Sequence, residues 1–247
     1  LSFPLMSAVR WKIVLSIMNY GVSWHRCLVI IVGVWPLSAV SPGKAGDFLK
    51  ARSLRHEIAP MKVAGSVLTE RSLDFLVLAV FAIIGGLWFR EVLIVLVALG
   101  VLLAILGVIG LAQLDIPLPR GNHIRKKVND LLVSIRLLGQ HRMSLAWILL
   151  LTIANWSGSI IQTKLLFDAI GVSVGLGFVA AALPVAIFVG LIPMTMGGMG
   201  TRDSAFVVLF AAFADPPQAL AVGLLYSVVA YWMVAILGIP LIGRALK

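Results

Sequence analysis

Residues 92–114 have the sequence VLIVLVALGVLLAILGVIGLAQL, a run without a single charged side chain. The hydrocarbon core of a bilayer is about 30 Å thick and an α-helix rises about 1.5 Å per residue, so roughly 20 apolar residues cross it. Backbone polar groups within lipid must be paired inside the segment, and the run lacks the alternation of a strand. The run therefore predicts a membrane-spanning helix.

The rest of the chain repeats this pattern. Three further uncharged runs are long enough to span, at Met143–Thr163, Ala169–Thr201 and Pro216–Gly243. A fifth run, Val63–Phe89, is long enough but carries charged residues in its first half. The 247 residues are 61% hydrophobic and 12% charged, about half the charged share of a soluble domain. We predict an all-α, polytopic integral membrane helix bundle.

The composition also excludes several classes. Disorder needs a high charge content, a disulfide scaffold needs many cysteines, and a coiled coil needs heptads. Cys27 is the single cysteine, and no Cys/His cluster has the spacing of a metal site. The sequence therefore predicts no metal and no cofactor.

The formal charge of +10 is concentrated in two loops, Ser41–Lys62 and Pro119–Arg142. The two spans between these loops form a hairpin, so both loops lie on one side, which the positive-inside rule makes cytoplasmic. The charge thus reports the orientation of the spans in a membrane, and no nucleic-acid partner is expected. Apolar residues recur at helical spacing after Lys127, which indicates either an amphipathic helix on an anionic leaflet or an ordinary basic loop.

Two runs are too short to span. Cys27–Gly43 contains prolines at 36 and 42 and has basic residues on both sides, which favours a segment that enters from the cytoplasm, turns near Pro36 to Gly46 and leaves on the same side. Near the other end, Ala169–Ile192 would go in and Ser204–Ala214 would come back out, with Met194–Asp203 as the turn. We therefore expect two broken or re-entrant segments.

The two expected turns resemble each other. Val32, Gly33, Pro36, Leu37 and Ser38 recur as Val189, Gly190, Pro193, Met194 and Thr195. Paired segments interrupted by Gly and Pro are typical of inverted-repeat transporters. This pattern predicts a single transmembrane domain over 1–247, with a first repeat at about 1–114, a basic cytoplasmic linker at 115–142 and a second repeat at about 143–247. Chance similarity of two apolar loops is the alternative.

The second turn has the chemistry of an anion site. Glycines at Gly197, Gly198 and Gly200 leave amide groups exposed, and a helix that begins near Thr201 adds its positive dipole end. A phosphate head group is the expected guest. Arg202 beside the turn would supply a charge-assisted contact, and Asp203 either caps the helix or pairs with Arg202.

The charged residues of the fifth run form a second candidate site. Glu70 and Asp74 are four residues apart on one helical face, and Arg71 is three residues from Asp74, so an intrahelical ion pair is available. Charges within a span cost several kcal/mol unless they are paired or face water. Either this face is turned into the protein, or the charges lie near the interface.

Three motifs in order resemble the transmembrane region of the lysylphosphatidylglycerol synthase and flippase-like family. The motifs are Pro42-Gly43-Lys44-Ala45-Gly46-Asp47 with Lys50, Glu70-Arg71-Ser72-Leu73-Asp74, and Pro193 with Gly197-Gly198-Met199-Gly200-Thr201-Arg202-Asp203. Lys50 stands where the family usually has arginine, and Asp203 where it has glutamate. The family's amino-terminal spans look incomplete here, so we expect an amino-terminal truncation.

The resemblance implies a bacterial or archaeal inner-membrane protein whose larger relatives carry a cytoplasmic aminoacyl-transferase domain, the membrane unit being associated with lipid flipping. We expect a flippase-like transporter of an anionic phospholipid or lipid-linked head group, with Lys44, Lys50 and Arg202 attracting it and Glu70, Arg71 and Asp74 forming a polar path. No nucleophile with a paired base appears. Two alternatives remain: an enzyme or enzyme subunit that modifies a lipid head group with Asp47 or Glu70 as general base, and a non-catalytic partner of a separate synthase.

Overall fold

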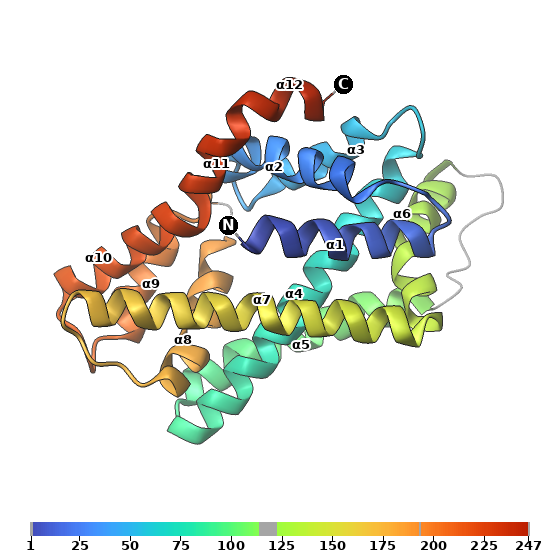
Figure 1. The fold of residues 1–247 in the computed structure, drawn as a ribbon. Coiled ribbons are helices and arrows are strands. Elements are labelled where there is room, and N and C mark those ends of the chain that lie inside the picture. Colours follow the sequence, from blue (N-terminus) through green and yellow to red (C-terminus); the bar gives the residue numbers. More distant parts are fainter. Residues whose placement is uncertain (1, 114–122, 193, 247) are drawn as a thin grey trace.

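The computed structural model describes residues 2–113, 123–192 and 194–246, and these residues form helices joined by short turns (Figure 1). The elements in chain order are α1 (Ser2–Ile17), α2 (Trp24–Val40), the 3-10 helix η1 (Ala45–Leu49), α3 (Lys50–Ser53), α4 (Pro60–Phe89), α5 (Val92–Gln113), α6 (His123–Gln140), α7 (Arg142–Ala169), α8 (Leu176–Gly190), α9 (Thr201–Leu209), α10 (Pro216–Ser227), the π-helical η2 (Val228–Trp232), α11 (Met233–Gly238), the 3-10 helix η3 (Ile239–Leu241) and α12 (Ile242–Ala245).

Four helical stretches are long and apolar enough to cross a membrane, at Pro60–Phe89, Val92–Gly110, Arg142–Ala169 and Pro216–Ala245. The prediction of an all-α, multi-pass membrane bundle is confirmed. The last stretch includes the π-helical turn η2, which the sequence did not predict. Apolar side chains such as Leu93, Leu96 and Leu103 are exposed along α5, as expected of a helix surrounded by lipid.

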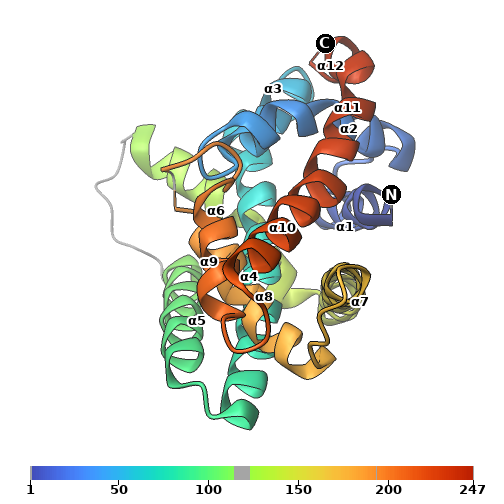
Figure 2. The same cartoon turned by 90° about the vertical axis from the view of Figure 1, so that its left-hand side faces the viewer.

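Helix α4 is the centre of the packing, since α5, α6, α7 and α8 all lie against it. Close approach depends on glycine: a Cβ on Gly65 would lie 2.1 Å from the carbonyl oxygen of Leu131 in α6. Helix α7 crosses in front of α4, with α1 running alongside α7 (Figure 1), and the view in Figure 2 shows α7 end-on beside α1.

The basic segment after residue 122 is a helix, α6, whose apolar side is covered by protein. Leu132, Ile135 and Leu138 are buried, and the hydroxyl groups of Ser134 and Thr69 in α4 are hydrogen-bonded at 2.8 Å. The amphipathic helix is therefore confirmed, but its apolar face packs on α4 and does not lie free on a leaflet. An ordinary loop is excluded for residues 123–140.

The two expected interruptions of the helices are present, and they touch. Helix α2 continues through Pro36 to Val40, so the chain turns at 41–44, within the expected region but after the first proline. Helix α8 ends at Gly190 and α9 begins at Thr201. An isolated antiparallel bridge joins Pro42 to Met196.

Glycine makes this contact possible. The amide of Gly197 donates to the carbonyl oxygen of Ser41 at 3.3 Å. Gly197 has a φ of +60°, and a Cβ there would lie 2.2 Å from the carbonyl oxygen of Ala39. We call this contact between the α2–η1 turn and the α8–α9 turn the joint. Pro193 of the expected motif lies outside the described residues.

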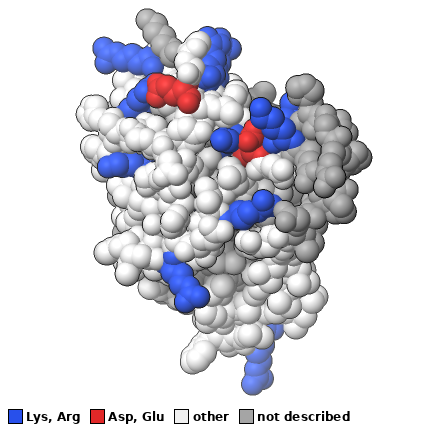
Figure 3. Space-filling view, turned by 90° about the vertical axis from the view of Figure 1, so that its right-hand side faces the viewer, with Lys and Arg blue, Asp and Glu red and all other residues white. Residues whose placement is uncertain are grey.

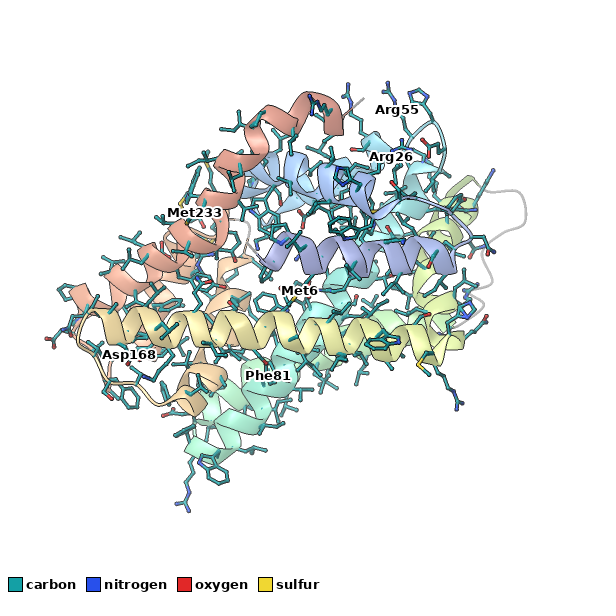
Figure 4. The ribbon with its side chains drawn as sticks, viewed as in Figure 1. Met6, Arg26, Arg55, Phe81, Asp168 and Met233 are labelled. Atoms are coloured by element: carbon teal, nitrogen blue, oxygen red, sulfur yellow. The ribbon has the colours of Figure 1, made fainter. Side chains whose placement is uncertain are left out.

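The basic side chains favour one end of the molecule. In Figure 3 most of those on the visible face lie in the upper half, where α2 and α3 lie in Figure 1. Figure 4 shows Arg26 and Arg55 at this end and Asp168 at the far end of α7. The division into repeats at about 1–114 and 143–247 stays a prediction, and its boundary at Leu114 lies outside the described residues.

Candidate functional site

Asp74 of α4 is the hub of a buried charge network. Its Oδ1 lies 2.9 Å from Nη1 of Arg10 in α1 and accepts a 3.1 Å hydrogen bond from the indole N–H of Trp156 in α7. Its Oδ2 accepts from Nη1 of Arg71, one helical turn away, at 3.3 Å. Asp74 is 5% exposed, so the predicted intrahelical pair exists and its face is turned into the protein. Three helices thus converge on one carboxylate.

Arg71 carries the network to the first interrupted segment, because its Nη2 also pairs with Oδ2 of Asp47 in η1. The hydroxyl of Ser38 donates to the other oxygen of Asp47 at 2.7 Å. Element η1 lies outside the four spanning stretches. Burial raises the pKa of Asp47, but the charges of Arg71 and Lys50 and the hydrogen bond from Ser38 outweigh it and lower the pKa to about 2. Asp47 is therefore ionised at neutral pH.

A second buried ion pair lies beside the first. Nζ of Lys50 is 3.3 Å from Oε2 of Glu70, and both side chains are 5% exposed. The ammonium also lies 5.1 Å from the ring centroid of Trp11, whose indole N–H donates to Ser66. A lone buried charge would be strongly unfavourable, so each member of this pair depends on the other.

Arg202 and Asp203 form a separate cluster at the start of α9. Oδ2 of Asp203 accepts from the amide of Gly200 at 3.0 Å, and its Oδ1 lies 3.7 Å from Nε of Arg202. Both expected roles of Asp203, capping and pairing, are thus present together. Arg202 also donates to the hydroxyl of Ser227 in α10, and it is 2% exposed.

Tyr231 lies between Lys44 of the α2–η1 turn and Arg202 at the start of α9. Its ring centroid lies 4.1 Å from Nζ of Lys44 in the first turn and 4.6 Å from the guanidinium carbon of Arg202 in the second. Tyr231 belongs to η2, and π-helical turns are often found at functional sites because the extra residue redirects side chains. One aromatic ring therefore faces a cation from each interrupted segment.

Two cavities meet at the Asp47–Arg71 pair. The first, which we call the aromatic cavity, has about 350 Å³ of empty space including its open part, and it is lined by Phe3, Trp35, Ser38, Ala39, Lys44, Asp47, Arg71, Trp156 and Tyr231. The second, which we call the charged cavity, has about 330 Å³ of empty space including its open part, and it is lined by Ser7, Arg10, Ile31, Trp35, Asp47, Lys50, Glu70, Arg71 and Asp74. Trp35, Asp47 and Arg71 line both.

The structure brings six predicted site residues to these cavities. Lys44, Asp47 and Arg71 line the aromatic cavity, while Lys50, Glu70 and Asp74 line the charged cavity. The other five, Gly197, Gly198, Gly200, Arg202 and Asp203, line neither and belong to the joint or its buried cluster. The amides of Gly197 and Gly200 already donate to Ser41 and Asp203, so these two donors are occupied here.

Sequence reasoning missed several residues of the site, among them Arg10, Ser38, Trp156 and Tyr231. Trp156 is 3% exposed, and its indole N–H donates to Asp74. Its place in the middle of the Met143–Thr163 run was a signal. Arg10 carried a signal too, because it and Lys12 interrupt an otherwise apolar stretch.

Among the described residues, no group of His, Cys, Asp and Glu has the arrangement of a metal site. The donors that face the cavities are guanidinium, ammonium and hydroxyl groups, and these bind oxyanions.

Comparisons with known proteins agree with the motifs. A family model described as the lysylphosphatidylglycerol synthase TM region matches residues 1–238. A UPF0104 membrane protein of Methanothermobacter thermautotrophicus is 23% identical over 274 aligned positions, which cover 95% of this chain and 79% of that protein. Another UPF0104 membrane protein of that organism is 30% identical over 96 positions, 38% of this chain and 29% of that protein. No solved structure matches the chain.

Proposed function

Since the chain belongs to the lysylphosphatidylglycerol synthase TM region family, we propose that it is a flippase-like transporter that binds the phosphate of an anionic phospholipid or lipid-linked head group in the plasma membrane. The observation that carries the proposal is the joint, where two interrupted segments meet beside a cavity that is lined by Lys44, Asp47 and Arg71. The rest of the chain consists mainly of apolar helices. Non-helical backbone at such a place is tolerated where it lines a cavity or is buried in protein.

The aromatic cavity supplies both parts of a head-group site. Lys44 and Arg71 are the cations that attract a phosphate, and the planar guanidinium of Arg71 can bind two phosphate oxygens at once. The ring of Phe3 packs edge-to-face on Trp35, with centroids 6.0 Å apart, and on Trp156, with centroids 5.6 Å apart. These three rings offer an apolar wall to the diacylglycerol part of the lipid.

The same geometry provides a way to release the lipid. Arg71 pairs with Asp47 and with Asp74 in the structure, so a phosphate must compete with two carboxylates for one guanidinium. Binding is weakened by this competition, and the Asp47–Arg71 pair reforms when the phosphate leaves. Transport requires affinity that is high enough for entry and low enough for exit, as it does in channels.

The test is lipid movement in reconstituted vesicles that contain fluorescent phosphatidylglycerol, followed by the loss of fluorescence when a reductant reaches only the outer leaflet. The variant is the double substitution Asp47→Asn, Arg71→Gln. It removes both charges together, so no uncompensated buried charge remains to unfold the protein. We expect lipid movement to fall to the level of empty vesicles.

The matched control is Arg26→Gln, Glu57→Gln. This pair has the same charges but is nearly half exposed, at 46% and 48%, and lies away from both cavities. It should leave lipid movement unchanged. If the cavity double variant keeps its fold, as judged by thermal melting, and moves lipid as fast as the wild type, the proposed function is wrong.

A further inference from the structure

Trp156 of α7 forms part of the boundary between the two cavities. Its ring lines the aromatic cavity, and its indole N–H donates at 3.1 Å to Oδ1 of Asp74, which lines the charged cavity. Phe3, which lines the aromatic cavity too, packs edge-to-face on the same ring. Trp156 is buried, so these contacts lie inside the protein. One rigid side chain therefore touches both the proposed lipid cavity and the buried charge network.

The indole contact determines how the carboxylate of Asp74 is oriented. Oδ1 receives the indole N–H of Trp156 and, at 2.9 Å, Nη1 of Arg10. Oδ2 is then the oxygen that faces Nη1 of Arg71, at 3.3 Å. Trp156 and Arg10 belong to α7 and α1, whereas Arg71 lies on α4 together with Asp74. Two other helices thus hold one oxygen and leave the second to the guanidinium that is proposed to bind phosphate.

Asp74 limits how freely Arg71 can turn toward a phosphate. The other carboxylate on this guanidinium, Asp47, lies in η1 and can separate from α4, but Asp74 is one turn away on the same helix. A hydrogen bond from Trp156 stabilises the negative charge of Asp74 and so weakens its attraction for Arg71. Without that bond, the carboxylate would hold the guanidinium more tightly, and Arg71 would be less available to a phosphate.

We propose that Trp156 is a positioning residue for the phosphate-binding site: through its hydrogen bond to Asp74 it keeps the guanidinium of Arg71 available to a phosphate in the aromatic cavity. The proposal rests on the phosphate binding of the proposed function and adds a residue that acts on it through Asp74. Because a coupling free energy is reciprocal, a phosphate bound to Arg71 strengthens the hydrogen bond between Trp156 and Asp74 in turn.

The first measurement is the affinity of the purified full chain in detergent for short-chain phosphatidylglycerol, determined by native mass spectrometry. In the test variant, benzothienylalanine replaces Trp156. This amino acid keeps the bicyclic ring but has a sulfur atom in place of the N–H. We expect binding about tenfold weaker than in the wild type, the change that the loss of one hydrogen bond to a charged group produces. Trp156→Phe should show the same loss.

Trp11→Phe is the matched control. Trp11 is also buried, and its indole N–H donates at 2.9 Å to the hydroxyl of Ser66, but it lines neither cavity. Both phenylalanine variants should melt below the wild type, because each loses a buried hydrogen bond. Only Trp156→Phe should bind lipid more weakly. Unchanged affinity in both variants would mean that Trp156 has a structural role alone, and it would overturn the inference.

The second measurement follows the indole N–H groups of the wild type by proton–nitrogen NMR. The chain has seven tryptophans, and the signals of Trp156 and Trp11 are assigned by their loss in the two phenylalanine variants. When short-chain phosphatidylglycerol is added, we expect the Trp156 proton to move downfield, as a shortened hydrogen bond requires, and the Trp11 proton to stay in place. A hydrogen bond that only stabilises the fold would show no such shift.

The inference and the proposed function fail in different ways. If the benzothienylalanine variant binds phosphatidylglycerol as tightly as the wild type, or if the Trp156 signal stays in place while lipid binds, the role of Trp156 is refuted and phosphate binding stands. If the wild type binds no phosphatidylglycerol, the proposed function is refuted and the inference falls with it.

Discussion

Replacing Gly197 by alanine tests whether the two interrupted segments depend on each other. A Cβ at this position would lie 2.2 Å from the carbonyl oxygen of Ala39, a separation that Cβ atoms essentially never show, so one backbone must move. The residue also has a φ of +60°, where alanine is disfavoured by roughly 1–2 kcal/mol. The substitution therefore adds a steric penalty to a conformational one.

The steric part can be separated from the conformational part by a second variant. Gly171 has a φ of +79°, yet a Cβ there would meet no atom within 4 Å, so Gly171→Ala carries only the conformational penalty. Gly197→Ala should lose, in addition, the 3.3 Å hydrogen bond to Ser41, worth about 1 kcal/mol, and the packing next to it. We expect its free energy of unfolding to fall by at least about 1 kcal/mol more than that of the control.

The assay is thermal melting of both variants in the same detergent. For a chain of this size, each kcal/mol lowers the midpoint by about 2–4 °C, so Gly197→Ala should melt at least that much below Gly171→Ala. Lipid movement should fall in Gly197→Ala and stay unchanged in the control. Equal melting temperatures would refute the reasoning, because the joint would then contribute nothing.

Two further predictions concern the buried charges. Asp74→Asn leaves Arg10 buried without its carboxylate and should lower the free energy of unfolding by about 3–5 kcal/mol. Glu57→Gln in the exposed pair should lower it by less than about 1 kcal/mol. Thermal melting of the two variants checks this contrast, and equal losses would contradict it. The pKa of Asp47 is about 2 in the fold against an ordinary 3.8, so its contribution to stability is complete above pH 4 and is lost as the pH falls toward 2. Melting temperatures measured across this range should show a drop in the wild type that is smaller in Asp47→Asn.

The spans could be predicted because their signal is local. Four of the five long apolar runs became helices long enough to cross a membrane, and the run at 92–114 became α5, Val92–Gln113. The run Ala169–Thr201 instead contains the shorter α8, which ends at Gly190. The inward face of α4 was one of the two alternatives that the sequence left open, and the cost of charges within a span is the reason for it. The interruptions were visible through their glycines and prolines, although α2 passes through Pro36 unbroken.

The partners of these residues could not be predicted, because they come from distant parts of the chain. Nothing in the sequence near Asp74 indicates that Arg10 and Trp156 will reach it from two other helices. The π-helical turn that presents Tyr231 to both cations is likewise set by packing, since it lies within a run that has the composition of an ordinary span.

The main-chain hydrogen bond between Ser41 and Gly197 also limits which walls of the aromatic cavity can move independently. Two loops that share a backbone hydrogen bond and have no room for a methyl group between them must travel as one body. If the chain moves lipid as proposed, the cavity can then change shape only where its lining lies outside these two loops, for example at the first turn of α1, which carries Phe3, and at the middle of α7, which carries Trp156.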